Sequence, residues 1–206
     1  MAGRAGQARF GDGQSTLDTR IGQQGEQIVS KLHCSYYESA VRRNMFISTT
    51  LARATSLAGT AMIGNIIYNP PDSGVNLVPL WWRSQIIATS ATTTAIALAV
   101  GYQPTTPTTV TVADASGCTF LQQPTLIAGK AKAYALATVL IAPVNIYILH
   151  HNTAAIAATG VDEVSGEIDG ALIVPPGHFL AFTAIGGAVA ASGHNSMLLW
   201  EEVPVV

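Results

Sequence analysis

Five histidines and a group of acids are the side chains of this chain that could bind a metal ion or transfer a proton. His150 and His151 are adjacent, and neighbours in a strand point to opposite faces, so regular strand geometry cannot bring both to one ion. Four acids could bind calcium, but they lack the six or more spaced oxygens of a dedicated loop. These are Asp162, Glu163, Glu167 and Asp169. Loop histidines and a solvated acidic strand face fit this spacing best.

Motifs with a defined chemistry are absent from the sequence. It has no nucleophile elbow, phosphate loop, dinucleotide fingerprint, His-Glu-x-x-His motif or paired cysteine motif. Cys34 and Cys118 lie far apart and have no metal-type spacing. The sequence therefore predicts no enzyme, no catalytic residue, no metal and no cofactor.

Trp81, Trp82 and Arg83 are the next residues of interest, because they suit recognition rather than catalysis. Adjacent strand residues face opposite ways, so Trp82 is expected in the core and Trp81 outside, on the same face as Arg83. An outward Trp beside an Arg is typical of an anchor in a subunit interface, and it also suits stacking on a sugar. Trp81 and Arg83 are predicted interface residues.

The elements that position these residues are predominantly strands. Residues 66–89 predict two strands joined by a loop, because Asn69 to Gly74 gather proline, glycine and side chains that bond to the backbone. Even positions from Val78 onward are mostly apolar, which indicates a strand buried on one face. Further short β patterns predict eight to eleven strands in a sandwich or jelly roll. They lie at residues 45–50, 61–69, 75–89, 94–102, 108–114, 118–122, 130–141, 144–151, 167–174, 178–185 and 196–203.

Two strand patterns carry alanine on every second residue. They lie at residues 94–102 and 130–137. A flat alanine face allows another subunit to approach closely, and a tightly packed interior layer uses one as well. Both interpretations remain open from the sequence.

Residues 1–43 differ in character from the rest. Glycine and glutamine predict an extended or disordered arm over residues 1–25, and apolar residues spaced three and four apart predict an amphipathic helix after Glu26. Residues 1–53 hold seven bases and four acids, a charge of +3, whereas residues 54–206 hold three bases and eight acids, a charge of −5. The segment suits docking on an acidic neighbour. Its predicted attachment residues are Arg4, Arg9, Arg20, Ile28, Leu32 and Tyr36.

Composition indicates extensive burial between subunits. Charged residues are 11% of the chain, against roughly 25% in average soluble domains.

The apolar stretches are broken by prolines such as Pro104, Pro107 and Pro143, so no membrane helix is predicted. The amino terminus lacks the apolar core of a secretory signal, which predicts maturation in the cytoplasm. The charge of the amino-terminal segment is too small to argue for nucleic-acid binding.

Three short patterns resemble small jelly-roll proteins of tailed-bacteriophage virions. They are the turn Asn-Pro-x-x-Ser-Gly at residues 69–74, the strand start Asn-Leu-x-x-Leu at residues 76–80 and the ending Trp-Glu-x-x-Pro at residues 200–204. The resemblance touches residues 66–89 and 167–206, roughly a third of the chain.

The resemblance implies an all-β, jelly-roll-like sandwich over residues 44–206, preceded by the arm and helix of residues 1–43. It also implies a virion structural protein, assembled in the host cytoplasm, of the capsid decoration, cement or head/tail attachment type. Such a protein would form a homo-oligomer, a trimer by resemblance, and contact major capsid, portal or tail proteins. The alternative is a receptor- or carbohydrate-binding module of a tail or head fibre that contacts host glycan.

Overall fold

The computed structural model describes residues 7–9, 16–18, 36, 39–40, 42–54, 56–58, 60–86, 94–112, 115–116, 129–152, 162–185 and 193–205. The chain divides into two compact units, Met1–Glu38 and Ser39–Val206. In the first unit, β1 (Gln7–Arg9) pairs antiparallel with β2 (Thr16–Asp18). Most of the predicted amphipathic helix, and the predicted strand at residues 118–122, lie outside the described residues.

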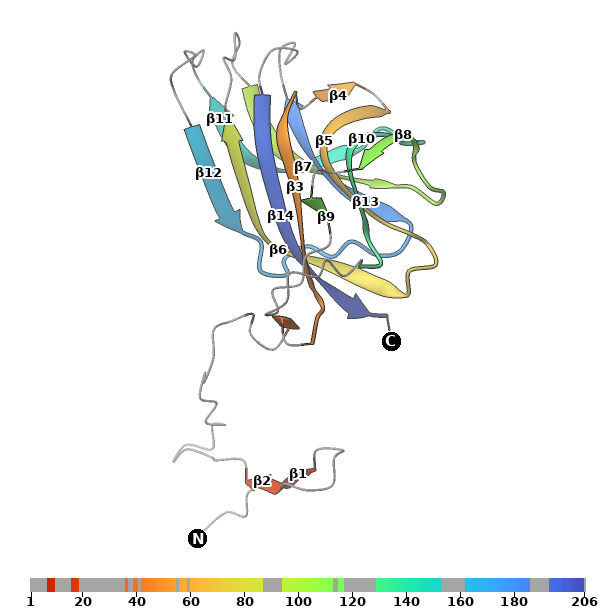
Figure 1. Cartoon of the computed structure of the whole chain (residues 1–206), viewed down its shortest axis with the longest axis vertical. Helices are drawn as coiled ribbons and strands as arrows, with labels where there is room; N and C mark the ends of the chain where they lie inside the picture. Colours follow the sequence, from red (N-terminus) through yellow and green to blue (C-terminus); the bar gives the residue numbers. More distant parts are fainter. Residues whose placement is uncertain are drawn as a thin grey trace. The chain divides into compact units, whose positions relative to one another are not determined.

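The second unit is a sandwich of two antiparallel sheets (Figure 1). The larger sheet has the order β11 (Val144–Asn152), β7 (Thr94–Tyr102), β13 (His178–Ile185), β5 (Ala61–Asn69), β10 (Lys132–Thr138) and β8 (Thr108–Val112), and β4 (Ser56–Ala58) also pairs with β5. The smaller sheet has the order β12 (Asp162–Glu167), β6 (Val75–Ile86), β14 (Gly193–Pro204), β3 (Met45–Ala54) and β9 (Ala115–Ser116). The prediction of a β-sandwich is confirmed.

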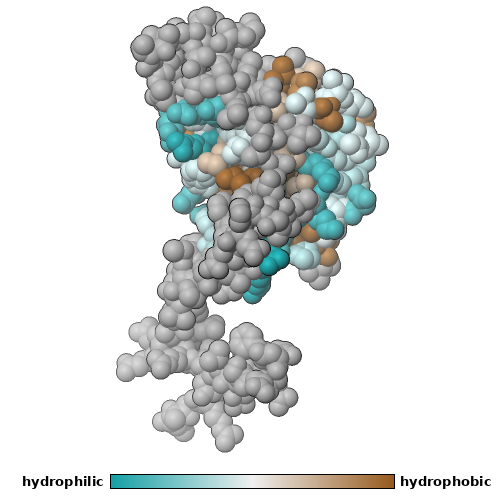
Figure 2. All heavy atoms as spheres, in the orientation of Figure 1, coloured by the Kyte–Doolittle hydropathy of each residue, from teal (hydrophilic) through white to brown (hydrophobic). Residues whose placement is uncertain are grey.

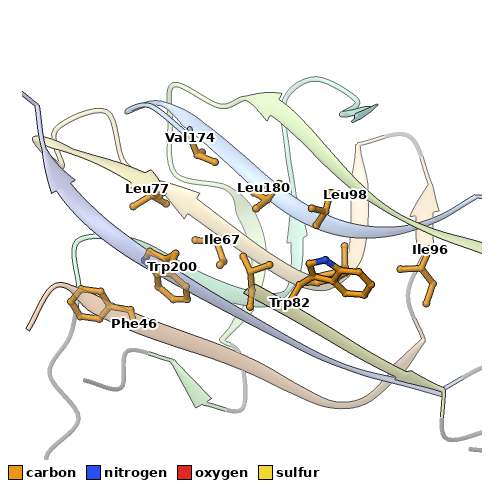
Figure 3. Packing of buried hydrophobic residues seen from close by; sticks show 11 residues of the cluster. Phe46, Ile67, Leu77, Trp82, Ile96, Leu98, Val174, Leu180 and Trp200 are labelled. Atoms are coloured by element: carbon orange, nitrogen blue, oxygen red, sulfur yellow. The ribbon is translucent and has the colours of Figure 1, made fainter. Parts of the chain in front are cut away.

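The core lies between the two sheets and takes large side chains from both. Trp82 of β6 contacts Phe182 of β13 with ring centroids 6.4 Å apart, and Phe46 stacks on Trp200 at 6.0 Å. Figure 3 shows both tryptophans among leucines and isoleucines contributed by both sheets. Each large side chain that leaves water stabilises the fold by about 1.5–3 kcal/mol, so these contacts hold the sheets together.

A buried asparagine adds a polar connection between the sheets. Asn65 of β5 accepts a hydrogen bond from the Ser48 hydroxyl at 2.8 Å and donates to the Ser48 carbonyl at 3.2 Å. Thr50 and Ser196 bond to each other through their hydroxyls at 2.8 Å beside it. Because unpaired polar groups in a core are costly, these bonds fix how β5 lies over β3 and β14.

The loop between β5 and β6 forms where the sequence predicts it. Gly74 has φ 68°, which glycine adopts without strain, and the Ser73 amide donates to the Pro70 carbonyl at 3.1 Å. The Asn69 side chain donates to the carbonyls of Val75 at 2.8 Å and Val174 at 3.0 Å. The two strands belong to different sheets, and β5 lies inside its sheet between β13 and β10.

The predicted strand at residues 167–174 is wrong. The strand β12 ends at Glu167, and the chain then turns, with Asp169 at φ 45° and Gly170 at φ 75°. The amides of Ile168 and Asp169 both donate to the Leu80 carbonyl. The segment after Glu167 therefore forms a turn that is hydrogen-bonded to β6, and β13 pairs with β5 and β7 rather than with this segment.

The alanine rows of β7 and β10 are buried within one chain. Ala97, Ala99 and Ala137 have no exposed surface. A Cβ added at Gly101, in the same row of β7, would lie 2.5 Å from the Phe179 ring. Of the two interpretations that the sequence left open, the interior layer is the one observed.

Candidate functional site

The outer face of the smaller sheet carries the predicted recognition residues. Trp82 is buried, and Trp81 is half-buried on the opposite face of β6, as predicted from their adjacency. Arg83 follows on the same outer face, because side chains two apart in a strand share a face. Its Nη2 lies 2.5 Å from Glu163 Oε2 of β12, and both side chains are about 40% exposed. An ion pair so exposed is a modest contribution to stability.

A polar groove lies on this face. We use that name for the hollow of about 300 Å³ lined by Thr49, Arg83, Gln85, Asn195 and Met197. Its amides and hydroxyl donate and accept hydrogen bonds, and its guanidinium donates them. Asn195 Oδ1 is buried with no hydrogen-bond partner among the described residues. The polar groove therefore has the groups to bind a polar ligand.

A second candidate surface was not predicted from the sequence. Six large apolar side chains within nine consecutive residues are 43–65% exposed, and we call them the β11 surface: Leu140, Ile141, Val144, Ile146, Tyr147 and Ile148. One signal was available, since the run from Val144 to Leu149 does not alternate and no residue from 133 to 149 is charged. A run of that kind indicates a strand without a defined solvent face.

The β11 surface borders an opening between the two sheets. Ile146 and Tyr147 line a cavity of about 240 Å³ together with Leu98 of β7 and with Ile168 and Leu172, which follow β12. Glu167 also lines it. The cavity therefore lies at the margin of the core, where the core residue Leu98 forms part of its wall. The margin on the β12 side is polar, and Figure 2 shows hydrophilic residues where Figure 1 places β12.

The structure brings only part of the predicted attachment set together. Trp81 and Arg83 share one face, Arg9 lies in β1 of the other unit, and Tyr36 is partly buried. The remaining four fall outside the described residues: Arg4, Arg20, Ile28 and Leu32.

Metal-binding side chains do not gather in the described ranges. No group of three His, Cys, Asp or Glu side chains is placed to hold an ion there. His178 instead packs on Tyr102 with ring centroids 5.1 Å apart, and its Nδ1 lies 3.1 Å from the Pro176 carbonyl. Among the residues that the structure describes, no helix has the length and apolar character needed to span a bilayer.

Comparison with known proteins returns nothing: no protein-family model, no curated protein and no solved structure matches the chain.

Proposed function

We propose that this chain is a jelly-roll structural protein of a tailed-bacteriophage virion, of the capsid decoration, cement or head/tail attachment type. The strand pairing is the observation that carries the proposal. Eight strands form the framework, in chain order β3, β5, β6, β7, β11, β12, β13 and β14. The first pairs with the eighth, the second with the seventh, the third with the sixth and the fourth with the fifth. Nested antiparallel pairs shared between two sheets are the pattern of a jelly roll.

The remaining strands extend this framework without altering it. Both β8 and β10 follow β7 in the chain, and β10 adds to the edge of the larger sheet beside β5. The short β9 adds to β3 at the corresponding end of the smaller sheet. The opposite ends of the sheets, at β11 and β12, carry no such extension among the described strands.

Double-sheet jelly rolls serve in viral capsids, in lectins and in cupins. The space between the two sheets is filled by Trp82, Leu98, Leu180 and Leu198, each at most 5% exposed. An enzyme with its site between the sheets would need a pocket there. This packing therefore favours the capsid and lectin types.

The low charge of the chain favours the capsid type. With 11% charged residues and a cluster of exposed apolar side chains at one margin, the sandwich suits an assembly in which subunits cover one another. In this proposal residues 1–43, with their positive charge and predicted amphipathic helix, attach the sandwich to capsid, portal or tail proteins.

Quantitative mass spectrometry of purified particles from the phage that encodes the chain tests the role. Hundreds of copies per particle would indicate decoration of the shell, and about a dozen or fewer would indicate a neck, tail or fibre position. Absence from washed particles would overturn the proposal.

A chain lacking residues 1–25 is expected to fold and to be lost from particles, because those residues supply attachment rather than core. Normal occupancy by this truncated chain would show that the sandwich itself carries attachment.

The polar groove favours a second candidate, a glycan-binding module of a fibre. The amides of Gln85 and Asn195 lie opposite each other in the groove, and Trp81 lies on the same face of β6, four residues before Gln85 and outside the groove lining. Amides with an aromatic ring on one face suit an extended sugar chain. Glycan-array binding that is lost in Trp81→Ala and Gln85→Ala, and kept in the control Val110→Glu, which lies on β8 of the other sheet, would support this candidate. An array with no signal for the full chain would remove it.

A further inference from the structure

Exposed apolar side chains gather at the β11 surface, whereas on the other described strands they lie further apart. Eleven large apolar side chains are exposed among the described residues, and six of them belong to the β11 surface. Two further exposed side chains lie near it: Tyr102, 51% exposed, is two residues beyond Val100, the pairing partner of Val144, and Ile173, 57% exposed, follows the cavity residue Leu172. Single exposed apolar residues are ordinary on a soluble protein, whereas a contiguous group marks a contact site.

This surface is held in place before any partner arrives. The buried Gln103 accepts a hydrogen bond from the Leu140 amide at 2.7 Å and donates to the Thr105 carbonyl at 2.6 Å, which fixes the turn leading into β11. Asn145 accepts from the Thr183 hydroxyl at 2.8 Å, which fixes the strand itself. Binding therefore orders few groups, and less of the contact energy is lost to conformational entropy.

Both faces of β11 contribute to the surface. Val144 and Tyr147 lie opposite Val100 and Leu98, on the core side, whereas Ile148 lies opposite Ala97, on the other side. The register shifts between Asn145 and Tyr147 and again between Ile148 and His150. Two irregularities in one short edge strand disrupt the row of backbone groups that another strand would need for pairing. The side chains, rather than the free backbone edge, are the means of contact.

We infer that the β11 surface binds the same surface of a second copy of this chain, as a two-fold dimer contact. No residue from 133 to 149 is charged, so this segment brings no like charges together when two copies meet, and a charged partner would gain no ion pair with it. A stable contact takes about 800 Å² from each partner. Six exposed side chains with two nearby ones supply the apolar centre of such an area, and a two-fold axis uses it on both subunits.

The inference goes beyond the proposed virion role and differs from the trimer that the sequence resemblance implies. A two-fold contact produces a dimer or an even-numbered assembly, whereas a trimer needs two different surfaces. The pairing would also cover the cavity that Ile146 and Tyr147 line.

Sedimentation equilibrium of the full chain at micromolar concentration tests the pairing. The unaltered chain is expected to have the mass of a dimer or of an even multiple. Ile148→Glu and Tyr147→Glu each place a charge in the contact, one on each face of β11, and each should raise the dissociation constant at least about 30-fold. The matched control is Val110→Glu, because Val110 is 43% exposed on β8 at the far end of the same sheet. It should keep the mass of the unaltered chain.

Thermal unfolding separates lost contact from lost fold, since both β11 variants replace exposed side chains and should keep a cooperative transition. A monomeric or trimeric unaltered chain, or equal dissociation by Val110→Glu, would overturn the inference. Copy number in particles is a separate measurement. A monomeric chain found in particles would remove the pairing and leave the virion role, and a dimeric chain missing from particles would do the reverse.

Discussion

The edge strands β11 and β12 lie next to each other at one margin of the sandwich and differ in how they meet solvent. Along β12, the exposed Glu163, Ser165 and Glu167 alternate with the half-buried Val164 and Gly166. Along β11, five consecutive residues from Val144 to Ile148 are exposed, and four of them are apolar. Charged residues on an edge discourage association, whereas an apolar edge invites it. At this margin, β12 is therefore suited to remain exposed to solvent, and β11 is suited to be covered by a partner.

The two strands are also attached differently. The pairing of β12 with β6 has no irregularity, and its Gly166 lies directly over Trp82, where an added Cβ would be 2.8 Å from Trp82 Nε1. The pairing of β11 with β7 has two irregularities and is reinforced by the side-chain bond from Thr183 to Asn145. We therefore expect packing to dominate the stability of β12 and hydrogen bonding to matter more for β11.

The largest effect is expected from Trp82→Ala, which removes the core side chain beneath β12. It should lower the free energy of unfolding by about 3–5 kcal/mol, because a buried Trp leaves a large cavity. Denaturant unfolding measures the loss. The control Trp81→Ala removes a half-buried ring from the outer face and should cost far less. If Trp81→Ala lowers the free energy of unfolding more than Trp82→Ala does, the assignment of Trp82 to the core face and Trp81 to the outer face is wrong.

Features that depend on neighbouring residues are predicted from the sequence better than features that depend on residues far apart in the chain. The loop after Asn69 and the opposite faces of Trp81 and Trp82 follow from local chemistry, and both are observed. The turn after Glu167 was mistaken for a strand, because its apolar residues Ile168 and Leu172 pack against the core while its backbone takes positive φ at Asp169 and Gly170. Alternation alone does not separate those two cases.

Contacts between segments far apart in the chain were harder still to predict from the sequence. The pairing of β3 with β14 joins strands well over a hundred residues apart, and no local pattern encodes it. The polar groove has the same origin, since Thr49, Arg83 and Asn195 come from three different strands. Arg83 was identified from its neighbour Trp81, whereas Thr49 and Asn195 offered no signal in the sequence.

A smaller effect is expected at the bond that reinforces β11. Asn145→Ala should lower the free energy of unfolding by about 0.5–1.5 kcal/mol, because it removes the acceptor for the Thr183 hydroxyl. A double-mutant cycle with Thr183→Val should give a coupling of similar size, measured by denaturant unfolding. Val110→Ala is the control, since it trims an exposed side chain on β8, outside the β11 surface. No coupling would mean that the pairing with β7 alone holds β11.

The smallest effect is expected at the ion pair that joins β12 to β6. Glu163→Gln removes the negative partner of Arg83, and both side chains are about 40% exposed, so the expected loss is about 0.2–1 kcal/mol at low salt. Thermal unfolding at low salt and in about 1 M salt measures it, because the Debye length falls to about 3 Å at the higher concentration. Glu167→Gln is the matched control, an exposed acid on the same face of β12. Salt should abolish the difference between the two variants. A difference that persists at high salt would show that the Arg83 contact acts through packing or hydrogen bonding. The outer face of β12 would then contribute to its stability in addition to the contact with Trp82 on the core face.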